Sequence, residues 1–178
     1  MDFSGLPAGF PPMATIIGIG GMSRAGKTHL ARRIQSYFGI ERCAVVSMDA
    51  FVFDVDETPK INGYPNWEIP ESIDYSGLIA QVVKLASSFD YVVVEGLLIF
   101  HDEGLNTLFD ERVLLEIERP LFLERRKKEK RWGPESMEYL DIVWNEYQRL
   151  RSVSLNRGAQ LYSGTEPAKK AFQFLTGK

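Results

Sequence analysis

The sequence predicts an α/β fold, a three-layer sandwich in which a mostly parallel five-stranded sheet lies between two layers of helices. Short apolar segments alternate with segments of helical periodicity along the chain. Hydrophobic residues make up 44% and charged residues 25% of the 178, an ordinary globular composition. The chain contains no internal repeat and no linker. We therefore expect residues 14–178 to form one domain and residues 1–13, rich in proline and glycine, to form a flexible tail.

Five segments have the features of strands. Four are short runs rich in valine, isoleucine and leucine, as expected for strands that are covered on both faces. The fifth is shorter and more polar, and we place it at the edge of the sheet. The five are residues 14–20, 43–49, 91–96, 112–118 and 159–162.

Helical patterns lie between these strands. The first places Leu30 and Ile34 on one face and ends at Gly39, a residue that commonly follows a helix. Asp74 and Pro120 are suited to the first positions of two further helices. The later helices are expected at residues 74–87, 120–131, 135–151 and 166–176, with one helical turn within 97–110 and irregular structure over 50–73.

Charge and cysteine content exclude several classes of protein. The formal net charge is −3 and the pI is near 5.5, so we expect no nucleic-acid partner. No apolar run approaches the ~20 residues that a membrane span needs. The single cysteine, Cys43, cannot form an internal disulfide, which favours a cytoplasmic protein. No His or Cys cluster has zinc-ligand spacing, and the sequence leaves a monomer or a homodimer open.

Residues 21–28, GMSRAGKT, match the phosphate-binding pattern G-x-x-x-x-G-K-[ST], between a predicted strand and a predicted helix. This is the P-loop of NTPases, and it implies ATP and Mg²⁺ as cofactors. Gly21 and Gly26 allow the backbone to curl so that several N–H groups point into one concavity. Lys27 can reach the β- and γ-phosphates, and the Thr28 hydroxyl can bind Mg²⁺. The alternative is a glycine-rich turn with a solvated lysine.

The other residues of this loop are expected to act mainly through their backbone. Ser23, Arg24 and Ala25 lie inside it, so we count them as cofactor-binding without giving their side chains a role. His29 follows at the start of the helix and is counted with them, although a packed or exposed helix histidine is the simpler interpretation.

Two acidic residues close predicted strands. Asp49 closes the second strand and Glu95 the third. Because ligands of open α/β sheets bind outside the carboxyl ends of the strands, we expect both acids to lie beside Lys27. Asp49 is the candidate base or orienting group for an acceptor hydroxyl, and Glu95 is the candidate Mg²⁺ acid. In the alternative, each acid simply caps the turn that follows its strand.

A basic run, ERRKKEKR, occupies residues 124–131, with Gly133 and Pro134 after it. Small kinases need a basic lid that covers the transferred phosphate, and we place such a lid at about residues 125–136. Arg126 and Arg131 are its candidate phosphate ligands. Lys128 and Trp132 are its candidate acceptor contacts. A solvated helical face or a nucleic-acid patch are the alternatives.

The motifs together resemble the nicotinamide riboside kinase and uridine kinase group of P-loop nucleoside kinases. The likeness covers about residues 15–175, and its best-matched segments are IIGIGGMSRAGKTHLA, VVSMDAF, VVVEGLLIF and LYSGTEPAKKAFQFL. The resemblance implies that Asp49 is the catalytic acid residue and that Glu95 serves the family's acidic position after the third strand. It also implies a small-molecule nucleoside as substrate.

The same resemblance gives a meaning to NWEIPESID, residues 66–74. It implies that Trp67 stacks on the base and that Glu68 accepts hydrogen bonds from ribose hydroxyls. The family usually has Asp where Glu68 stands, and the uridine kinase pattern has His where Ile69 stands. The second feature, together with the short chain, favours nicotinamide riboside over uridine. A kinase for another small alcohol, such as pantothenate, and a nucleotide-binding regulatory module without catalysis remain alternatives.

Overall fold

The computed structural model describes residues 14–54, 56–61, 64–128, 135–165 and 168–177. The expected tail at residues 1–13 lies outside the described residues. So does half of the expected lid, because residues 129–134 are not among them.

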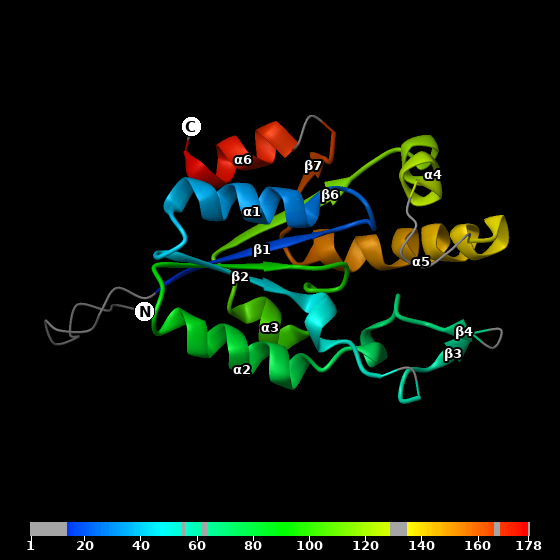
Figure 1. The fold of residues 1–178 in the computed structure, drawn as a ribbon, viewed down its shortest axis with the longest axis horizontal. Coiled ribbons are helices and arrows are strands. Elements are labelled where there is room, and N and C mark those ends of the chain that lie inside the picture. Colours follow the sequence, from blue (N-terminus) through cyan, green and yellow to red (C-terminus); the bar gives the residue numbers. More distant parts are fainter. Residues whose placement is uncertain (1–13, 55, 62–63, 129–134, 166–167, 178) are drawn as a thin grey trace, which may run out of the picture.

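One five-stranded sheet forms the centre of the fold (Figure 1). All of its strand pairs are parallel, which confirms the expected five-stranded parallel sheet. The strand order is β2-β5-β1-β6-β7, with the predicted edge strand β7 at one edge. The strands are β1 (Thr15–Gly21), β2 (Cys43–Ser47), β5 (Tyr91–Glu95), β6 (Glu111–Glu116) and β7 (Gln160–Ser163).

The register of the sheet brings the carboxyl ends of three strands to one level. Glu95 of β5 lies opposite Ile19 of β1 and opposite Ser47 of β2. The P-loop follows β1 directly, and Asp49 follows β2 by two residues. The sheet therefore delivers the loop and both predicted acids to the same edge.

Helices cover both faces of the sheet (Figure 1). α1 and α6 lie on one face, and α2 and α3 lie on the other. The Asp74 carboxylate caps α2 by accepting a 2.9 Å hydrogen bond from the Gly77 amide, as predicted. α4 begins one residue before Pro120, and α5 extends past the predicted end at 151. The helices are α1 (Lys27–Phe38), α2 (Tyr75–Ala86), α3 (Glu103–Thr107), α4 (Arg119–Lys127), α5 (Met137–Asn156) and α6 (Lys169–Thr176).

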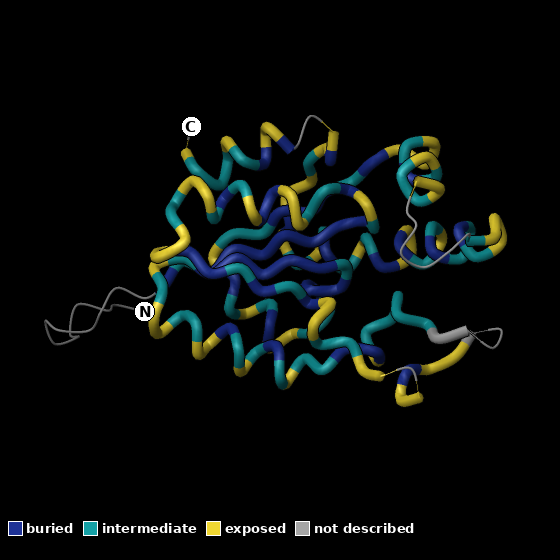
Figure 2. The backbone as a smooth tube through the Cα atoms, in the orientation of Figure 1, coloured by how far each residue is buried: buried dark blue, intermediate teal, exposed yellow. Residues whose placement is uncertain are grey.

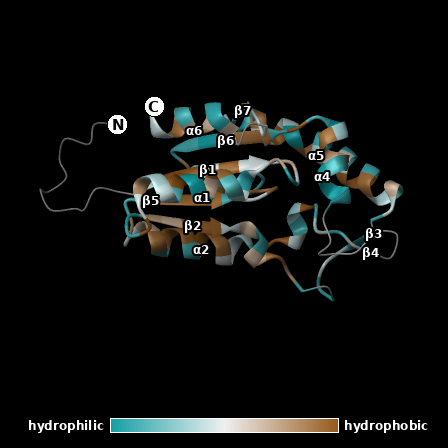
Figure 3. Ribbon diagram, turned by 45° about the horizontal axis from the view of Figure 1, so that its top comes forward, coloured by the Kyte–Doolittle hydropathy of each residue, from teal (hydrophilic) through white to brown (hydrophobic). Residues whose placement is uncertain are grey.

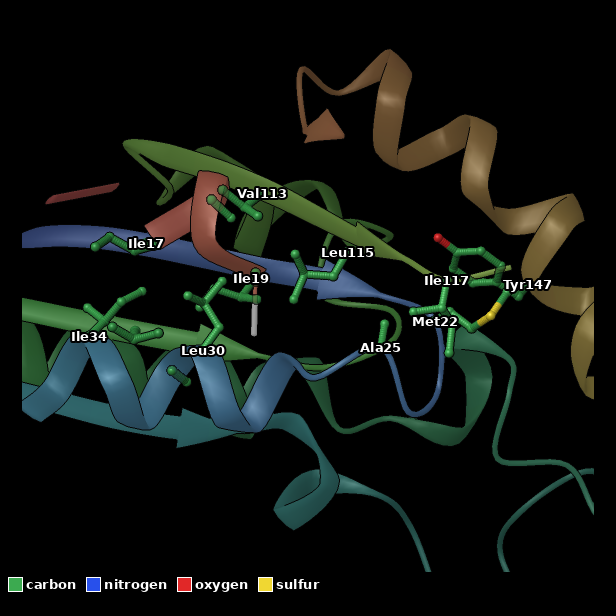
Figure 4. Packing of buried hydrophobic residues seen from close by; sticks show 14 of the residues in the cluster. Ile17, Ile19, Met22, Ala25, Leu30, Ile34, Val113, Leu115, Ile117 and Tyr147 are labelled. Atoms are coloured by element: carbon green, nitrogen blue, oxygen red, sulfur yellow. The ribbon is translucent and has the colours of Figure 1, made fainter. Parts of the chain in front are cut away.

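Two apolar clusters, one on each face of the sheet, form the core. Leu30 and Ile34 of α1 pack on the first face, where Figure 4 shows them against the strand residues. Leu78 and Val82 of α2 pack on the second. Because both faces are covered, the central strands are buried along their length, which Figure 2 shows as dark blue. In Figure 3, β1 is largely hydrophobic whereas α4 is largely hydrophilic.

The segment 50–73, expected to be irregular, contains short regular pieces. β2 ends at Ser47, and a 3₁₀ turn over Met48–Phe51 carries Asp49. Further on come the two-residue strands β3 (Lys60–Ile61) and β4 (Tyr64–Pro65), which pair antiparallel, and a second 3₁₀ turn over Pro70–Ser72. Among the described residues, no helix is both long and apolar enough to cross a membrane.

Candidate active site

The glycines of the P-loop are required by its geometry. Gly21 has a φ of +134°, and a Cβ built there would lie 2.2 Å from the Leu115 carbonyl oxygen. Gly26, with a φ of +97°, lies in the left-handed region at the start of α1. The Met22 amide donates to the same Leu115 oxygen at 3.1 Å, and the Ala25 amide donates to the Met22 carbonyl at 3.1 Å. A side chain at Gly21 would break this closed loop.

Lys27 lies over the loop, with its Nζ donating to the Met22 carbonyl at 3.0 Å. Burial lowers the pKa of Lys27, and the nearby carboxylates of Glu95, Asp49 and Glu68 oppose this effect, in that order of size. Three carboxylates on three different segments are thus close enough to act on one ammonium group. The structure brings together the residues that the sequence analysis assigned to phosphate, metal and acceptor.

Thr28 and Glu95 form a pair suited to a hard cation. The Thr28 hydroxyl donates to Glu95 Oε1 at 3.2 Å, and Glu95 is only 4% exposed. Among the described residues, no three His, Cys, Asp or Glu side chains are grouped to hold a metal by themselves. Mg²⁺ commonly binds through one or two protein oxygens, several waters and the substrate phosphates, and this pair fits that donor set.

Asp49 lies on the exposed side of its 3₁₀ turn, next to the segment that carries Glu68. Backbone hydrogen bonds join the two segments: the Asp74 amide donates to the Phe51 carbonyl at 2.8 Å and the Phe53 amide to the Ser72 carbonyl at 3.0 Å. These bonds hold the predicted acceptor segment against the chain that leaves β2. Asp49 and Glu68 are therefore near each other although no helix or strand contains both.

Glu68 is held by its own turn. Its amide donates to Asn66 Oδ1 at 3.2 Å, and the Ser72 hydroxyl donates to the Asn66 carbonyl at 2.6 Å. Burial raises the pKa of the Glu68 carboxyl, while the positive charges of Arg126 and Lys27 act in the opposite direction. Its carboxyl is therefore within interaction range of both Lys27 of the P-loop and Arg126 of α4. Trp67, the predicted stacking residue, is half-buried beside it.

α4 contacts the P-loop through two arginines. Arg126 Nη1 donates to the Ser23 hydroxyl at 2.9 Å, and Arg125 Nη1 donates to the Arg24 carbonyl at 2.7 Å. The first contact corrects the expectation that the Ser23 side chain has no role. Arg24 itself has a φ of +66°, a left-handed conformation that is uncommon outside glycine. The predicted phosphate ligand Arg126 thus lies at the loop.

Four of the predicted contacts stay predictions. Two of them, Arg131 and Trp132, lie outside the described residues. Lys128 Nζ bonds Glu124 at 2.5 Å on the exposed side of α4, so its role at the acceptor stays a prediction. His29 is exposed on α1, and its assignment also stays a prediction.

Sequence reasoning missed three residues that the structure brings to this region. Glu135, just before α5, pairs with Arg126, and Tyr139 of α5 is close enough to interact with both Arg126 and Glu68. Gly164, in the turn after β7, packs on Ala25 of the P-loop. The sequence carried a signal only for Gly164, as the glycine of an S-G-T turn. Glu135 and Tyr139 depend on how α5 approaches α4.

The chain is similar in sequence to nucleoside kinases, although no protein-family model matches it. Nicotinamide riboside kinase 1 of Homo sapiens is 27% identical over 154 residues, which cover 76% of this chain and 76% of that protein. Nicotinamide riboside kinase 2 of Mus musculus is 26% identical over 169 residues, or 84% of this chain and 86% of that protein. Uridine kinase of Chlamydia pneumoniae is 29% identical over 137 residues, or 62% and 61%.

Solved structures of kinases share the fold. A sugar kinase from a Janibacter species matches with a TM-score of 0.61 at 14% identity, over 92% of this chain and 93% of that one. Shikimate kinase of Aquifex aeolicus matches with a TM-score of 0.55 at 18% identity, over 91% and 94%. These likenesses support the fold, and the sequence relatives do not distinguish nicotinamide riboside from uridine. The chain is therefore a distant homologue of the nicotinamide riboside kinases and uridine kinases, with the fold of P-loop kinase structures.

Proposed function

We propose that the protein transfers the γ-phosphoryl group of ATP to the primary hydroxyl of a ribonucleoside, with nicotinamide riboside as the best candidate. The observation that carries this proposal is the convergence of Asp49 and Glu68 on Lys27. A nucleotide-binding module needs only the P-loop. Two further carboxylates at the same place supply what an acceptor alcohol needs, a group that orients its hydroxyl and a group that binds its sugar.

Each residue then has a defined task in the transfer. The amides of the P-loop and Lys27 hold the phosphates, and Arg126 stabilises the charge of the transferred group. Asp49 accepts the proton of the acceptor hydroxyl as the new O–P bond forms and the bond to the β-phosphate oxygen breaks, which releases ADP. Mg²⁺, held by Thr28 and Glu95, would neutralise phosphate charge. The work of these residues is mainly positioning and electrostatic stabilisation.

The acceptor side favours a flat, cationic base. Trp67 provides a ring face, and rings attract a cation placed over them. Asp49, Glu68 and Glu95 make the surroundings acidic, which further favours a positively charged ring such as a pyridinium. Nicotinamide riboside has this charge and uridine does not. Uridine is the second candidate, because a uridine kinase is also among the relatives, at 29% identity.

A coupled ADP-release assay over a panel of acceptors tests the proposal. We expect ADP release with nicotinamide riboside, a weaker response with uridine, and none with pantothenate or simple sugars. ADP release with a non-nucleoside alcohol alone would reassign the acceptor. If ATP binds and no acceptor in the panel raises ADP release above the acceptor-free rate, the proposal is wrong and a regulatory module is favoured.

A further inference from the structure

We propose that Glu135 is a positioning residue that orients the Arg126 guanidinium toward a phosphate bound in the P-loop. The inference rests on the proposed function, because Arg126 is taken to bind a nucleotide phosphate. Glu135 lies just before α5 and Arg126 lies in the last turn of α4. Figure 1 shows α4 and the beginning of α5 at the end of the molecule where the central strands end.

Two parallel hydrogen bonds fix the orientation of the guanidinium. Arg126 Nε donates to Glu135 Oε2 at 2.9 Å, and Arg126 Nη2 donates to Glu135 Oε1 at 2.5 Å. Such a two-point contact holds both the position and the plane of an arginine side chain. A third bond, from Nη1 to the Ser23 hydroxyl at 2.9 Å, points the remaining corner of the guanidinium at the P-loop.

The Arg126 guanidinium keeps an N–H group that can still donate to a ligand in the P-loop. A guanidinium has five N–H groups, and the three bonds to Glu135 and Ser23 use three of them. The Tyr139 hydroxyl is also close enough to interact with Arg126 and could take one more. At least one N–H group is then left for a phosphate oxygen. Glu135 binds the Nε and Nη2 edge, whereas Nη1 bonds Ser23 of the loop, so Glu135 orients Arg126 without covering Nη1.

The Arg126–Glu135 ion pair is largely shielded from solvent. The side chains of Arg126 and Glu135 are 11% and 14% exposed, whereas those of the Lys128–Glu124 pair on α4 are 74% and 56% exposed. Exposed ion pairs contribute little, because water and salt screen them. A half-buried two-point pair is screened less, and it also restricts a flexible side chain before ligand binds. Losing Glu135 should therefore let the guanidinium leave the orientation that faces the loop.

Arg126 also has a second acid nearby. Its charge lowers the pKa of Glu68 against the larger effect of burial, so the Glu68 carboxyl is near the same guanidinium. Without Glu135, this carboxyl would attract Arg126 toward the acceptor side of the site. Glu135 thus keeps Arg126 on the phosphate side of a site that contains several competing carboxylates.

Equilibrium binding of ATP and of AMP, measured by calorimetry at constant Mg²⁺, tests this role. AMP lacks the β- and γ-phosphates, so a loss confined to ATP identifies the phosphate contact. We expect Glu135→Gln to weaken ATP binding about tenfold, because the charged hydrogen bonds that orient Arg126 are weakened, and to leave AMP binding unchanged within about twofold. Glu135→Asp keeps the charge and should recover part of the loss. Arg126→Ala and the double variant should bind ATP equally weakly.

Glu146→Gln is the matched control, because Glu146 lies on α5 and pairs with an arginine, Arg149, whose side chain is 63% exposed. It should leave both affinities unchanged. Equal losses for ATP and AMP, additive effects of the Arg126 and Glu135 substitutions, or tighter ATP binding by Glu135→Gln would each overturn the proposal. If Glu135→Gln fails to fold, the Glu135→Asp variant decides. The measurement needs no acceptor, so it stands even if the acceptor panel shows no kinase activity.

Discussion

Gly164 packs directly on the carbonyl of Ala25 in the P-loop. A Cβ built on Gly164 would lie 2.2 Å from the Ala25 oxygen and 3.1 Å from Cγ2 of Ile117. The Gly164 amide donates to the Glu116 carbonyl at 2.7 Å, which fixes the turn after β7 in place. The C-terminal part of the chain thus forms one wall of the phosphate site, because the turn has no side chain there.

The Gly164→Ala variant should therefore weaken nucleotide binding. The added methyl group cannot fit without moving the Ala25 carbonyl or the turn, and such overpacking costs about 1–3 kcal/mol. We expect a lower melting temperature and an ATP affinity reduced by about tenfold or more, measured by thermal unfolding and calorimetry. Gly104→Ala on α3 is the control, since a Cβ there would lie 3.3 Å from Asp102 Oδ1, a contact that a shift of a few tenths of an ångström relieves. Equal ATP affinity in both variants would contradict the contact.

Local sequence patterns predicted most of the strands and helices. They did not predict the order of the strands in the sheet. Runs such as YVVVEG predict buried strands because residues like Val92, Val93 and Val94 must be covered on both faces. The position of β5 between β2 and β1 depends instead on where the connecting helices pack. The end of α5 at Asn156, past the predicted limit, likewise depends on tertiary contacts rather than on local signals.

The Thr28–Glu95 pair predicts a shared role toward Mg²⁺. Thr28→Ala should raise the Mg²⁺ concentration needed for half-maximal activity by about tenfold. This is the loss expected when a metal site loses an oxygen that binds the metal or orients another ligand. Thr28→Ser keeps the hydroxyl and should retain most of the activity. Mg²⁺ titrations of the turnover rate provide the measurement. Because the Thr28 hydroxyl donates to Glu95, the two residues should be coupled. Glu95→Gln should therefore reduce turnover less in the Thr28→Ala background than in wild type. Fully additive losses would show that the two residues act separately.

The parts of the site differ in how far sequence could predict them. The roles of Lys27 and Thr28 can be predicted from the P-loop motif, because the spacing of its residues determines the geometry of the loop. The proximity of Glu68 to Lys27 was expected only through a family resemblance, since the two belong to distant segments. Glu135 could not be predicted, because its contact with Arg126 exists only once α4 and α5 are packed. Local chemistry is readable from sequence, and contacts between separately folded segments are not.

Asp49→Asn should separate binding from catalysis. The amide cannot accept the acceptor proton, so we expect turnover to fall by at least about 100-fold. ATP affinity should be unchanged or higher, because a negative charge near the phosphates is removed. Calorimetry with ATP and single-turnover kinetics measure the two effects. Asp54→Asn is the control, an exposed acid on the same segment, and it should behave as wild type. Turnover near the wild-type rate in Asp49→Asn would exclude a role as base.

The raised pKa of Glu68 predicts an unusual dependence of stability on pH. The pKa in the folded protein lies above the ordinary 4.5, so ionised Glu68 destabilises the fold at neutral pH. This destabilisation is complete above the folded pKa and vanishes as the pH falls below 4.5. Glu68→Gln should therefore melt at a higher temperature than wild type at neutral pH, and the difference should shrink on acidification. Thermal unfolding over a pH series measures both.

The same titration should appear in acceptor binding, which tests whether the burial of Glu68 serves the substrate. A protonated carboxyl has less capacity to accept from two ribose hydroxyls, so wild-type acceptor KM should rise as the pH falls through the folded pKa. Glu68→Gln should bind acceptor weakly at every pH, with this dependence removed. Glu71→Gln, an exposed acid in the next turn, should keep the wild-type profile. If wild type instead melts at a higher temperature than Glu68→Gln at neutral pH, Glu68 is a stabilising ion-pair partner. Its burial would then cost no stability that acceptor recognition has to explain.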